Sequence, residues 1–132
     1  ETSLPVARGL IRALNEPMHG VKLDCIVIEL GDGIMGDYGV AEILGAADLM
    51  VHGKAHVLCA NDPVGAWGAV KHFRDDLGLP LLVISGPTTD NAVGRKFVEE
   101  RLGKKAINAR SSGDALAQAV ADALTEGADA PA

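Results

Sequence analysis

The stretch AHVLCANDPVGAWGAVKHFRDDLGLPLLVI, residues 55–84, decides the fold. Its two ends are short apolar runs of strand length. Its middle carries apolar side chains at helical spacing, namely Val64, Trp67, Val70, Phe73 and Leu77. Gly78 and Pro80 end this helix, because glycine closes helices and proline cannot continue them. A strand, a helix and a second strand in this order predict a crossover between parallel strands.

The same alternation precedes this stretch. Apolar spacing predicts a helix over residues 4–14, which Pro17 ends, and a short helix over residues 40–44. Between them, the almost wholly apolar residues 24–30 are typical of a parallel strand that is buried on both faces.

The alternation also continues to the carboxyl end. The sequence predicts a helix capped by Asp90 or Asn91, a short strand over residues 105–108 and an alanine-rich helix through about Leu124. We therefore expect a three-layer, Rossmann-like α/β sandwich with a mainly parallel sheet of about four strands and helices on both faces.

The chain has the length of one domain, with 132 residues. We expect residues 1–125 to form a single α/β domain. Residues 126–132 are expected to be a flexible tail, because they have nothing to bury.

Composition excludes several classes of protein. The formal charge of -6 lacks the basic excess of a nucleic-acid binder, and 3% aromatic residues leave few platforms for stacking bases. No apolar run approaches the ~20 residues of a membrane span. Cys25 and Cys59 both stand in apolar runs, which predicts buried, reduced thiols in a cytoplasmic protein.

Ligands of parallel sheets bind at the carboxyl ends of the strands, so the loops after the predicted strands are the candidate site. These loops are rich in glycine and polar residues. The candidate ligand-binding residues that they contain are Gly31, Gly33, Gly36, Asn61, Asp62, Ser85, Gly86, Thr88 and Asn91.

Acidic residues in the first of these loops suggest a metal site. Glu29 ends an apolar strand, where an unpaired carboxylate is costly to bury and a divalent cation would relieve the cost. Asp32 and Asp37 could join it, because Mg²⁺ prefers oxygen ligands. In the alternative interpretation, Asp32 and Gly33 form a turn and Asp37 caps the next helix.

The glycines of this loop permit a different function. Gly31, Gly33 and Gly36 match the spacing G-x-G-x-x-G of NAD(P)-binding proteins, in which backbone amides cradle a phosphate at a helix N-terminus. Asp32 and Asp37 would repel a pyrophosphate there.

The sequence gives little support for nucleophilic catalysis or for a metal site of histidine and cysteine. Ser85 lacks a G-x-S-x-G motif, and the series His52, His56 and Cys59 does not share one face of an element. No catalytic residue is identified.

The order of these motifs resembles the C-terminal half of a P-loop NTPase of the dethiobiotin synthetase and cobyrinate amidase-synthase type. Three segments carry the resemblance: residues 28–33 (IELGDG), residues 57–65 followed by the helix of Trp67, and residues 83–91 (VISGPTTDN). It implies that Glu29 helps to hold Mg²⁺ and that residues 83–91 contact a nucleotide base. The phosphate-binding G-x-x-x-x-G-K-[ST] motif is absent from these 132 residues, and Leu30 replaces the family's glycine.

The sequence therefore predicts a domain that binds a nucleotide or phosphometabolite and forms the C-terminal part of a larger Mg²⁺-dependent enzyme using ATP or GTP. A missing N-terminal domain would supply the phosphate loop. Two alternatives stay open: a non-catalytic regulatory or homo-oligomerisation domain, and an NAD(P)-binding domain. Neither nucleic acid nor membrane is expected as a partner.

Overall fold

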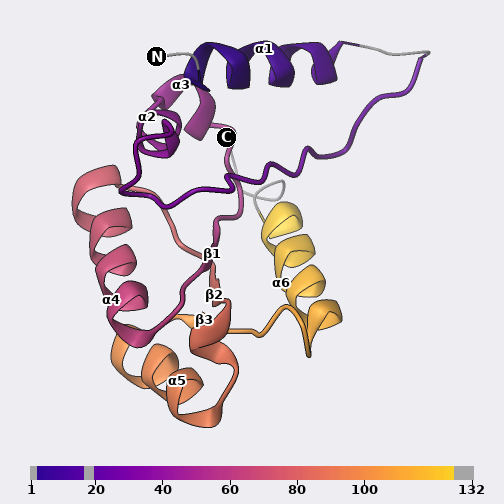
Figure 1. Cartoon of the computed structure of the whole chain (residues 1–132). Helices are drawn as coiled ribbons and strands as arrows, with labels where there is room; N and C mark the ends of the chain where they lie inside the picture. Colours follow the sequence, from indigo (N-terminus) through magenta and orange to yellow (C-terminus); the bar gives the residue numbers. More distant parts are fainter. Residues whose placement is uncertain (1–2, 17–19, 127–132) are drawn as a thin grey trace. The chain divides into compact units, whose positions relative to one another are not determined.

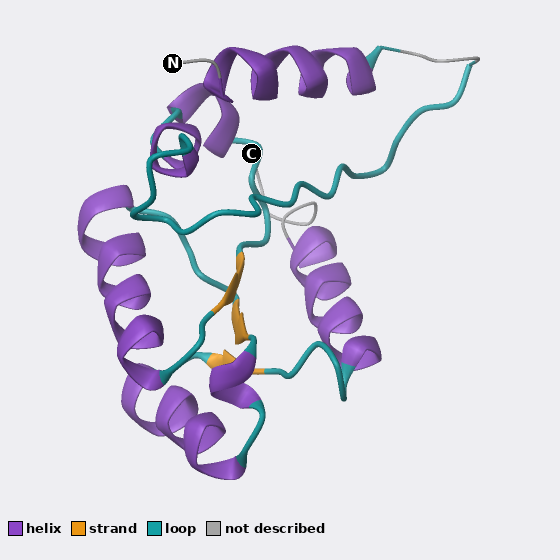
Figure 2. Cartoon of the chain, viewed as in Figure 1, coloured by secondary structure: helices purple, strands orange, loops and turns teal. Residues whose placement is uncertain are grey.

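The computed structural model describes residues 3–16 and 20–126. The chain divides into two compact units, Glu1–His52 and Gly53–Ala132. Among the described residues, the first unit contains helices and irregular chain, and the second contains a parallel β-sheet with helices (Figure 1, Figure 2). The chain is therefore α/β, with all of its described strands in the second unit.

The described part of the first unit contains the helices α1 (Ser3–Asn15), α2 (Val40–Leu44) and α3 (Ala47–Met50). The predictions for α1 and α2 are confirmed, while Pro17 lies outside the described residues. Arg8 of α1 donates from Nε and Nη2 to both carboxylate oxygens of Asp48 on α3, at 2.9 and 2.8 Å. These hydrogen bonds hold the pKa of the Asp48 carboxyl below its usual range.

Gly39 determines how α2 starts. Its φ of 85° is in the left-handed region, and no side chain caps the helix, so Asp37 is not the cap. A Cβ at Gly39 would lie 2.6 Å from the Cβ of Ser3, whose hydroxyl donates to the carbonyl of Tyr38 at 2.8 Å. The glycine therefore permits the loop before α2 to pass close to α1.

The strand predicted over residues 24–30 does not form, so this prediction was wrong. These residues have no regular secondary structure, and the side chains of Val27 and Ile28 are 89% and 52% exposed. An extended segment becomes a strand only when a neighbour satisfies its backbone groups, and no described strand pairs with this one. The apolar run alone could not supply that partner.

The sheet of the second unit has three parallel strands, rather than about four, in the order β1-β2-β3. The strands are β1 (Val57–Cys59), β2 (Val83–Ser85) and β3 (Lys105–Ala106). All three residues of β2 are buried, so the central position belongs to β2 and not to residues 24–30. The two crossovers expected from the alternation are present.

Each crossover helix ends in a π-helical turn. The first is α4 (Pro63–His72) followed by η1 (Phe73–Leu77), and the second is α5 (Ala92–Lys96) followed by η3 (Phe97–Arg101). The predicted end at Gly78 is confirmed, with a left-handed φ of 63°. Figure 1 shows α4 and α5 on one side of the strands and α6 (Gly113–Glu126) on the other. Residues 127–132 of the expected tail lie outside the described residues.

The core of the second unit lies between the strands and these helices. Val83 and Ile84 of β2, Val98 of η3 and Ala66 of α4 are fully buried, and Phe73 is 4% exposed. Trp67, on the outer side of α4, is 51% exposed and has the Lys71 ammonium 5.5 Å from its ring centroid.

The edge strand β1 is more exposed to solvent than its apolar composition predicts. The amide of Ala60 donates to the carbonyl of Ser85, and the carbonyl of His56 accepts from Leu82. Backbone groups of alternate residues of β1 therefore bond to β2, while those of Val57 and Cys59 face the open edge of the described sheet. The side chains of Val57 and Cys59 lie on one face of the strand, and both residues are exposed, whereas Leu58 is half-buried. Cys59 is exposed, as is Cys25 in the first unit, so the prediction that both thiols are buried was wrong.

Close backbone packing at Gly94 yields a stability prediction. A Cβ at this position would collide with the carbonyl oxygen of Thr88, whereas a Cβ at Gly68 of α4 would meet nothing within 4 Å. Gly94→Ala should lower the free energy of unfolding by about 1–3 kcal/mol, the usual cost of overpacking. Gly68→Ala should leave it unchanged or raise it by up to ~1 kcal/mol, because alanine favours helix. Urea unfolding followed by circular dichroism measures both, and equal effects would refute the close contact.

Candidate functional site

Three polar loops lie at the carboxyl edge of the sheet in the second unit, each directly after a strand. They comprise residues 60–62 after β1, residues 86–91 after β2 and residues 107–112 after β3. Because the strands are parallel, their carboxyl ends share one edge. The structure thus brings together six of the predicted site residues, namely Asn61, Asp62, Ser85, Gly86, Thr88 and Asn91.

Gly86 holds the second loop against the end of β1. Its φ is 82°, and a Cβ would lie 2.9 Å from both the nitrogen and the oxygen of Ala60. The amide of Thr88 donates to the same Ala60 carbonyl at 3.0 Å. Gly86 therefore has a structural role, which is to let two loops approach closely.

Asn108 connects the second loop to the third. Its Nδ2 donates to Thr89 Oγ1 at 3.1 Å and to Asp90 Oδ1 at 2.8 Å, and its Oδ1 accepts from the amides of Arg110 and Ser111, each at 3.0 Å. The residue is only 7% exposed. Sequence analysis did not assign it to the site, although an asparagine between a strand and a helix is a usual residue for such a turn.

Three predicted ligand-binding residues use their side chains within the fold. Asp62 accepts from the amide of Gly65 at 2.8 Å and caps α4, and Asn91 accepts from the amide of Gly94 at 2.9 Å and caps α5. Ser85 Oγ accepts from the amide of Ala109 at 3.0 Å. These side chains shape the edge, and their described bonds are to the chain itself.

Other polar groups at this edge take no part in these bonds. Thr88 is 3% exposed, and its Oγ1 has no hydrogen-bond partner among the described residues. Asn61, Arg110 and Ser111 are exposed. The first turn of α6 begins beside Arg110, and the first amides of a helix lack helical partners. Hydroxyl, amide and guanidinium groups therefore lie at the same edge of the sheet as the beginning of α6.

The other predicted site residues, Glu29, Gly31, Asp32, Gly33 and Gly36, belong to the first unit. The amide of Gly36 donates to the carbonyl of Gly33 at 2.9 Å, which closes a turn. A Cβ at Gly36 would collide with the Asp32 carboxylate, so this side chain folds over the turn.

The structural context expected for this glycine-rich loop is absent. No strand precedes Gly31, and α2 begins only at Val40, whereas the dinucleotide motif requires a strand before it and a helix directly after it. Glu29 is exposed, so the burial cost that motivated a metal at this position does not arise.

The acidic residues do not assemble a metal centre. Among the residues that the structure describes, no three His, Cys, Asp or Glu side chains come together to hold an ion. His56 instead places Nδ1 2.9 Å from the carbonyl of Pro80 and packs edge-on against Phe73, with ring centroids 5.9 Å apart. The geometry of Glu29 and Asp32 by itself does not fit a Mg²⁺ site.

Comparison with known proteins adds no relative: no protein-family model, curated protein or solved structure matches this chain. Within residues 3–16 and 20–126, no helix combines the length and the apolar character that crossing a membrane requires.

The neighbouring residues Thr88 and Thr89 provide a matched test of the edge. Thr89 Oγ1 donates to the Gly86 carbonyl at 2.7 Å and accepts from Asn108, whereas Thr88 Oγ1 has no described partner. Thr89→Val should lower the free energy of unfolding by about 1–3 kcal/mol, because it leaves the Gly86 carbonyl and the Asn108 amide without this hydrogen-bond partner. Thr88→Val should leave it unchanged or raise it, because it removes an unsatisfied hydroxyl. Thermal and urea unfolding measure the pair, and a larger loss for Thr88→Val would contradict this bonding pattern.

Proposed function

We propose that this chain binds a nucleotide or another phosphorylated metabolite at the carboxyl edge of the sheet in its second unit. The observation that carries the proposal is the gathering of three polar loops at the end of a parallel sheet, the place where ligands of such sheets bind. In this proposal the second unit is a Rossmann-like fold.

The groups available at this edge suit a phosphate. The exposed guanidinium of Arg110 stands at the beginning of α6, and the amides of a helix N-terminus favour negative charge. Asn61 offers an exposed amide for a base or sugar. No described ion pair engages Arg110.

Turnover of ATP or GTP would need a further component. The phosphate-binding G-x-x-x-x-G-K-[ST] motif does not occur in the 132 residues, so another segment or chain would supply that loop. Mg²⁺ enters this proposal only together with the nucleotide, as the counter-ion of its phosphates. Glu29 and Asp32 belong to the first unit, so neither they nor the metal is assigned a step here.

Calorimetric titration with ATP and with GTP, each with Mg²⁺, tests the proposal. Arg110→Gln should weaken binding about tenfold, which is the usual size of a charge-assisted hydrogen bond to phosphate. Arg101→Gln is the matched control, because Arg101 is also an exposed arginine but lies on η3, before β3 rather than after it. No heat with either nucleotide, alone or with a candidate partner chain, would count against the proposal, as would equal losses in the two variants.

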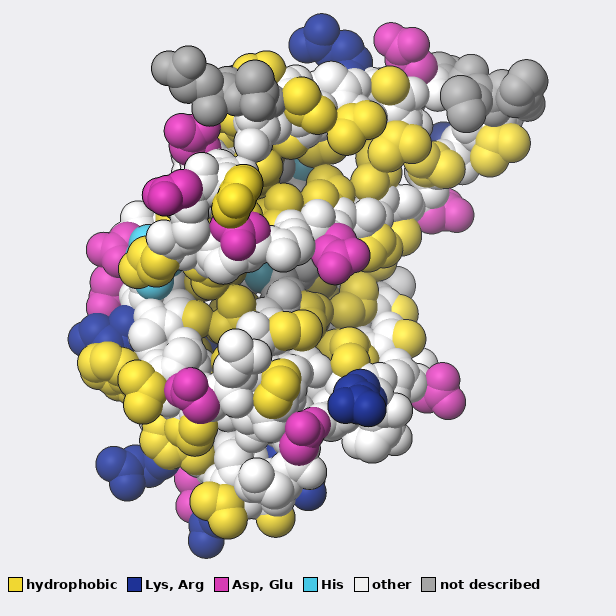
Figure 3. Space-filling model, in the orientation of Figure 1, with side chains coloured by type: hydrophobic (Ala, Val, Ile, Leu, Met, Phe, Trp, Pro, Cys, Tyr) yellow, Lys and Arg dark blue, Asp and Glu magenta, His cyan; other side chains and the backbone are white. Residues whose placement is uncertain are grey.

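The exposed apolar surface of the first unit favours a second candidate, a domain that assembles with other subunits. Of the fourteen large hydrophobic residues that are exposed within the described part of the chain, ten belong to this unit, from Val6 to Val51. Figure 3 shows apolar side chains over much of the visible face. Exposed apolar area of this kind is typical of interaction surfaces.

Light scattering coupled to size exclusion tests this second candidate. A homo-oligomer is expected, and Val27→Asp should shift it toward monomer, because Val27 is 89% exposed in the first unit. Val93→Asp serves as the control, since Val93 is 79% exposed in the second unit. A monomer at all concentrations, or equal dissociation by both variants, would argue against assembly through the first unit.

A further inference from the structure

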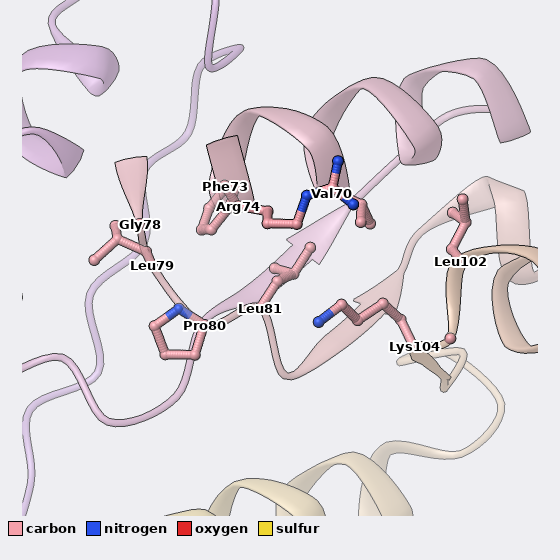
Figure 4. Close-up of a pocket in the computed structure, with 10 residues that line it drawn as sticks. Val70, Phe73, Arg74, Gly78, Leu79, Pro80, Leu81, Leu102 and Lys104 are labelled. Atoms are coloured by element: carbon pink, nitrogen blue, oxygen red, sulfur yellow. The ribbon is translucent and has the colours of Figure 1, made fainter. Parts of the chain in front are cut away.

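A cavity of about 520 Å³ opens at the amino edge of the sheet in the second unit, the edge opposite the polar loops (Figure 4). Its lining comes from the end of the first crossover, the chain before β2 and the chain before β3. Val70, Phe73 and Leu81 form an apolar floor, with exposed fractions of 9%, 4% and 5%. Its size is within the range of small-molecule sites.

Two glycines keep the sides of this cavity open. Gly78 and Gly103 each follow a π-helical turn, and each has a left-handed φ of 63°. A Cβ at either position would meet nothing within 4 Å. The chain thus turns from helix to strand twice without a side chain at the corner, and the space between the two corners stays unfilled.

Lys104 supplies a charge to this apolar space. Its amide donates to the Val98 carbonyl at 3.3 Å, which fixes the backbone directly after Gly103. Figure 4 shows its side chain extending into the cavity, with the ammonium toward Leu81. No ion pair among the described residues uses this half-buried ammonium.

The second cation of the cavity is already compensated. Arg74 donates from Nε and Nη2 to the two carboxylate oxygens of Asp75, at 2.6 and 2.9 Å. These hydrogen bonds lower the pKa of Asp75, so its charge persists and balances that of Arg74. One net positive charge, that of Lys104, is therefore left beside an apolar floor.

We propose that this cavity binds a small monocarboxylate with an apolar body. The carboxylate pairs with the Lys104 ammonium, and the hydrocarbon part covers Phe73, Val70 and Leu81, which removes apolar area from water. A phosphate dianion suits the cavity less, because one lysine leaves its second negative charge uncompensated. This site is separate from the proposed nucleotide site and does not depend on it.

Titration of the ¹⁵N-labelled chain with hexanoate at pH 7 tests the proposal. The amide signals of Gly78 and Gly103 should shift saturably, and 1-hexanol, which has the same body without the charge, should bind about tenfold more weakly. Lys104→Gln should weaken hexanoate binding by a similar factor, while Lys104→Arg should retain it within about threefold because the charge is kept. Lys105→Gln, at the exposed lysine that follows, is the matched control and should bind as the unchanged chain does.

Three outcomes would overturn the proposal. The first is the absence of a saturable shift at the two glycine amides. The second is equal binding of hexanoate and 1-hexanol, which would mean simple apolar adsorption. The third is a loss in Lys105→Gln as large as that in Lys104→Gln. The amide spectrum of each variant shows whether it folds, and inorganic phosphate in place of hexanoate tests the preference for a monoanion.

Discussion

The hydrogen bonds of the Asn108 side chain hold together the loops at the carboxyl edge of the second unit. Strands β2 and β3 end beside each other, so the loops that leave them present backbone groups that the ladder no longer satisfies. A single buried amide serves both loops, donating toward Thr89 and Asp90 and accepting from two amides before α6. An aspartate at this position would keep the acceptor and lose both donors.

Most of the second unit could be predicted from the sequence, because its signals are local. The spacing of apolar residues from Val64 to Leu77 and the glycine at position 78 define the first crossover without reference to the rest of the chain. The cap at Asn91 is a contact between residues three apart. Helix spacing, helix ends and caps each depend on a few neighbouring residues, so they can be predicted from the sequence.

The predictions that were wrong concern residues whose structure depends on partners distant in the sequence. The run over residues 24–30 has the composition of a buried strand, but only a neighbouring strand decides whether it becomes one. The prediction that Cys59 is buried failed for the same reason. A short apolar run has the same composition at the centre of a sheet and at its edge, and β1 is an edge strand.

The meeting of the loops was predicted more successfully than the roles of their side chains. The loops after β1 and β2 meet as expected, yet Asp62, Ser85 and Asn91 bond to nearby amides, while Thr88 does not. Residue type alone cannot separate these cases, since capping and ligand binding use the same polar side chains. Hydrogen-bond geometry separates them.

The two edges of the sheet differ in character. At the carboxyl edge, polar side chains hold each other in place through short bonds, which pre-organises the backbone. At the amino edge, two left-handed glycines leave an apolar space beside one ammonium. The two crossovers produce both edges. Each crossover leaves one strand at the carboxyl edge and enters the next strand at the amino edge.

The division into two units gives the second unit an optical signal of its own. The only tryptophan, Trp67, is on α4 of the second unit, and the only tyrosine, Tyr38, is in the first. Tryptophan emission excited at long wavelength therefore reports the second unit alone, and its half-exposed ring beside Lys71 makes it sensitive to local solvent. Tyr38 is 77% exposed, so its signal changes little when the first unit unfolds. The unfolding of the second unit can thus be followed separately in the intact, unlabelled chain.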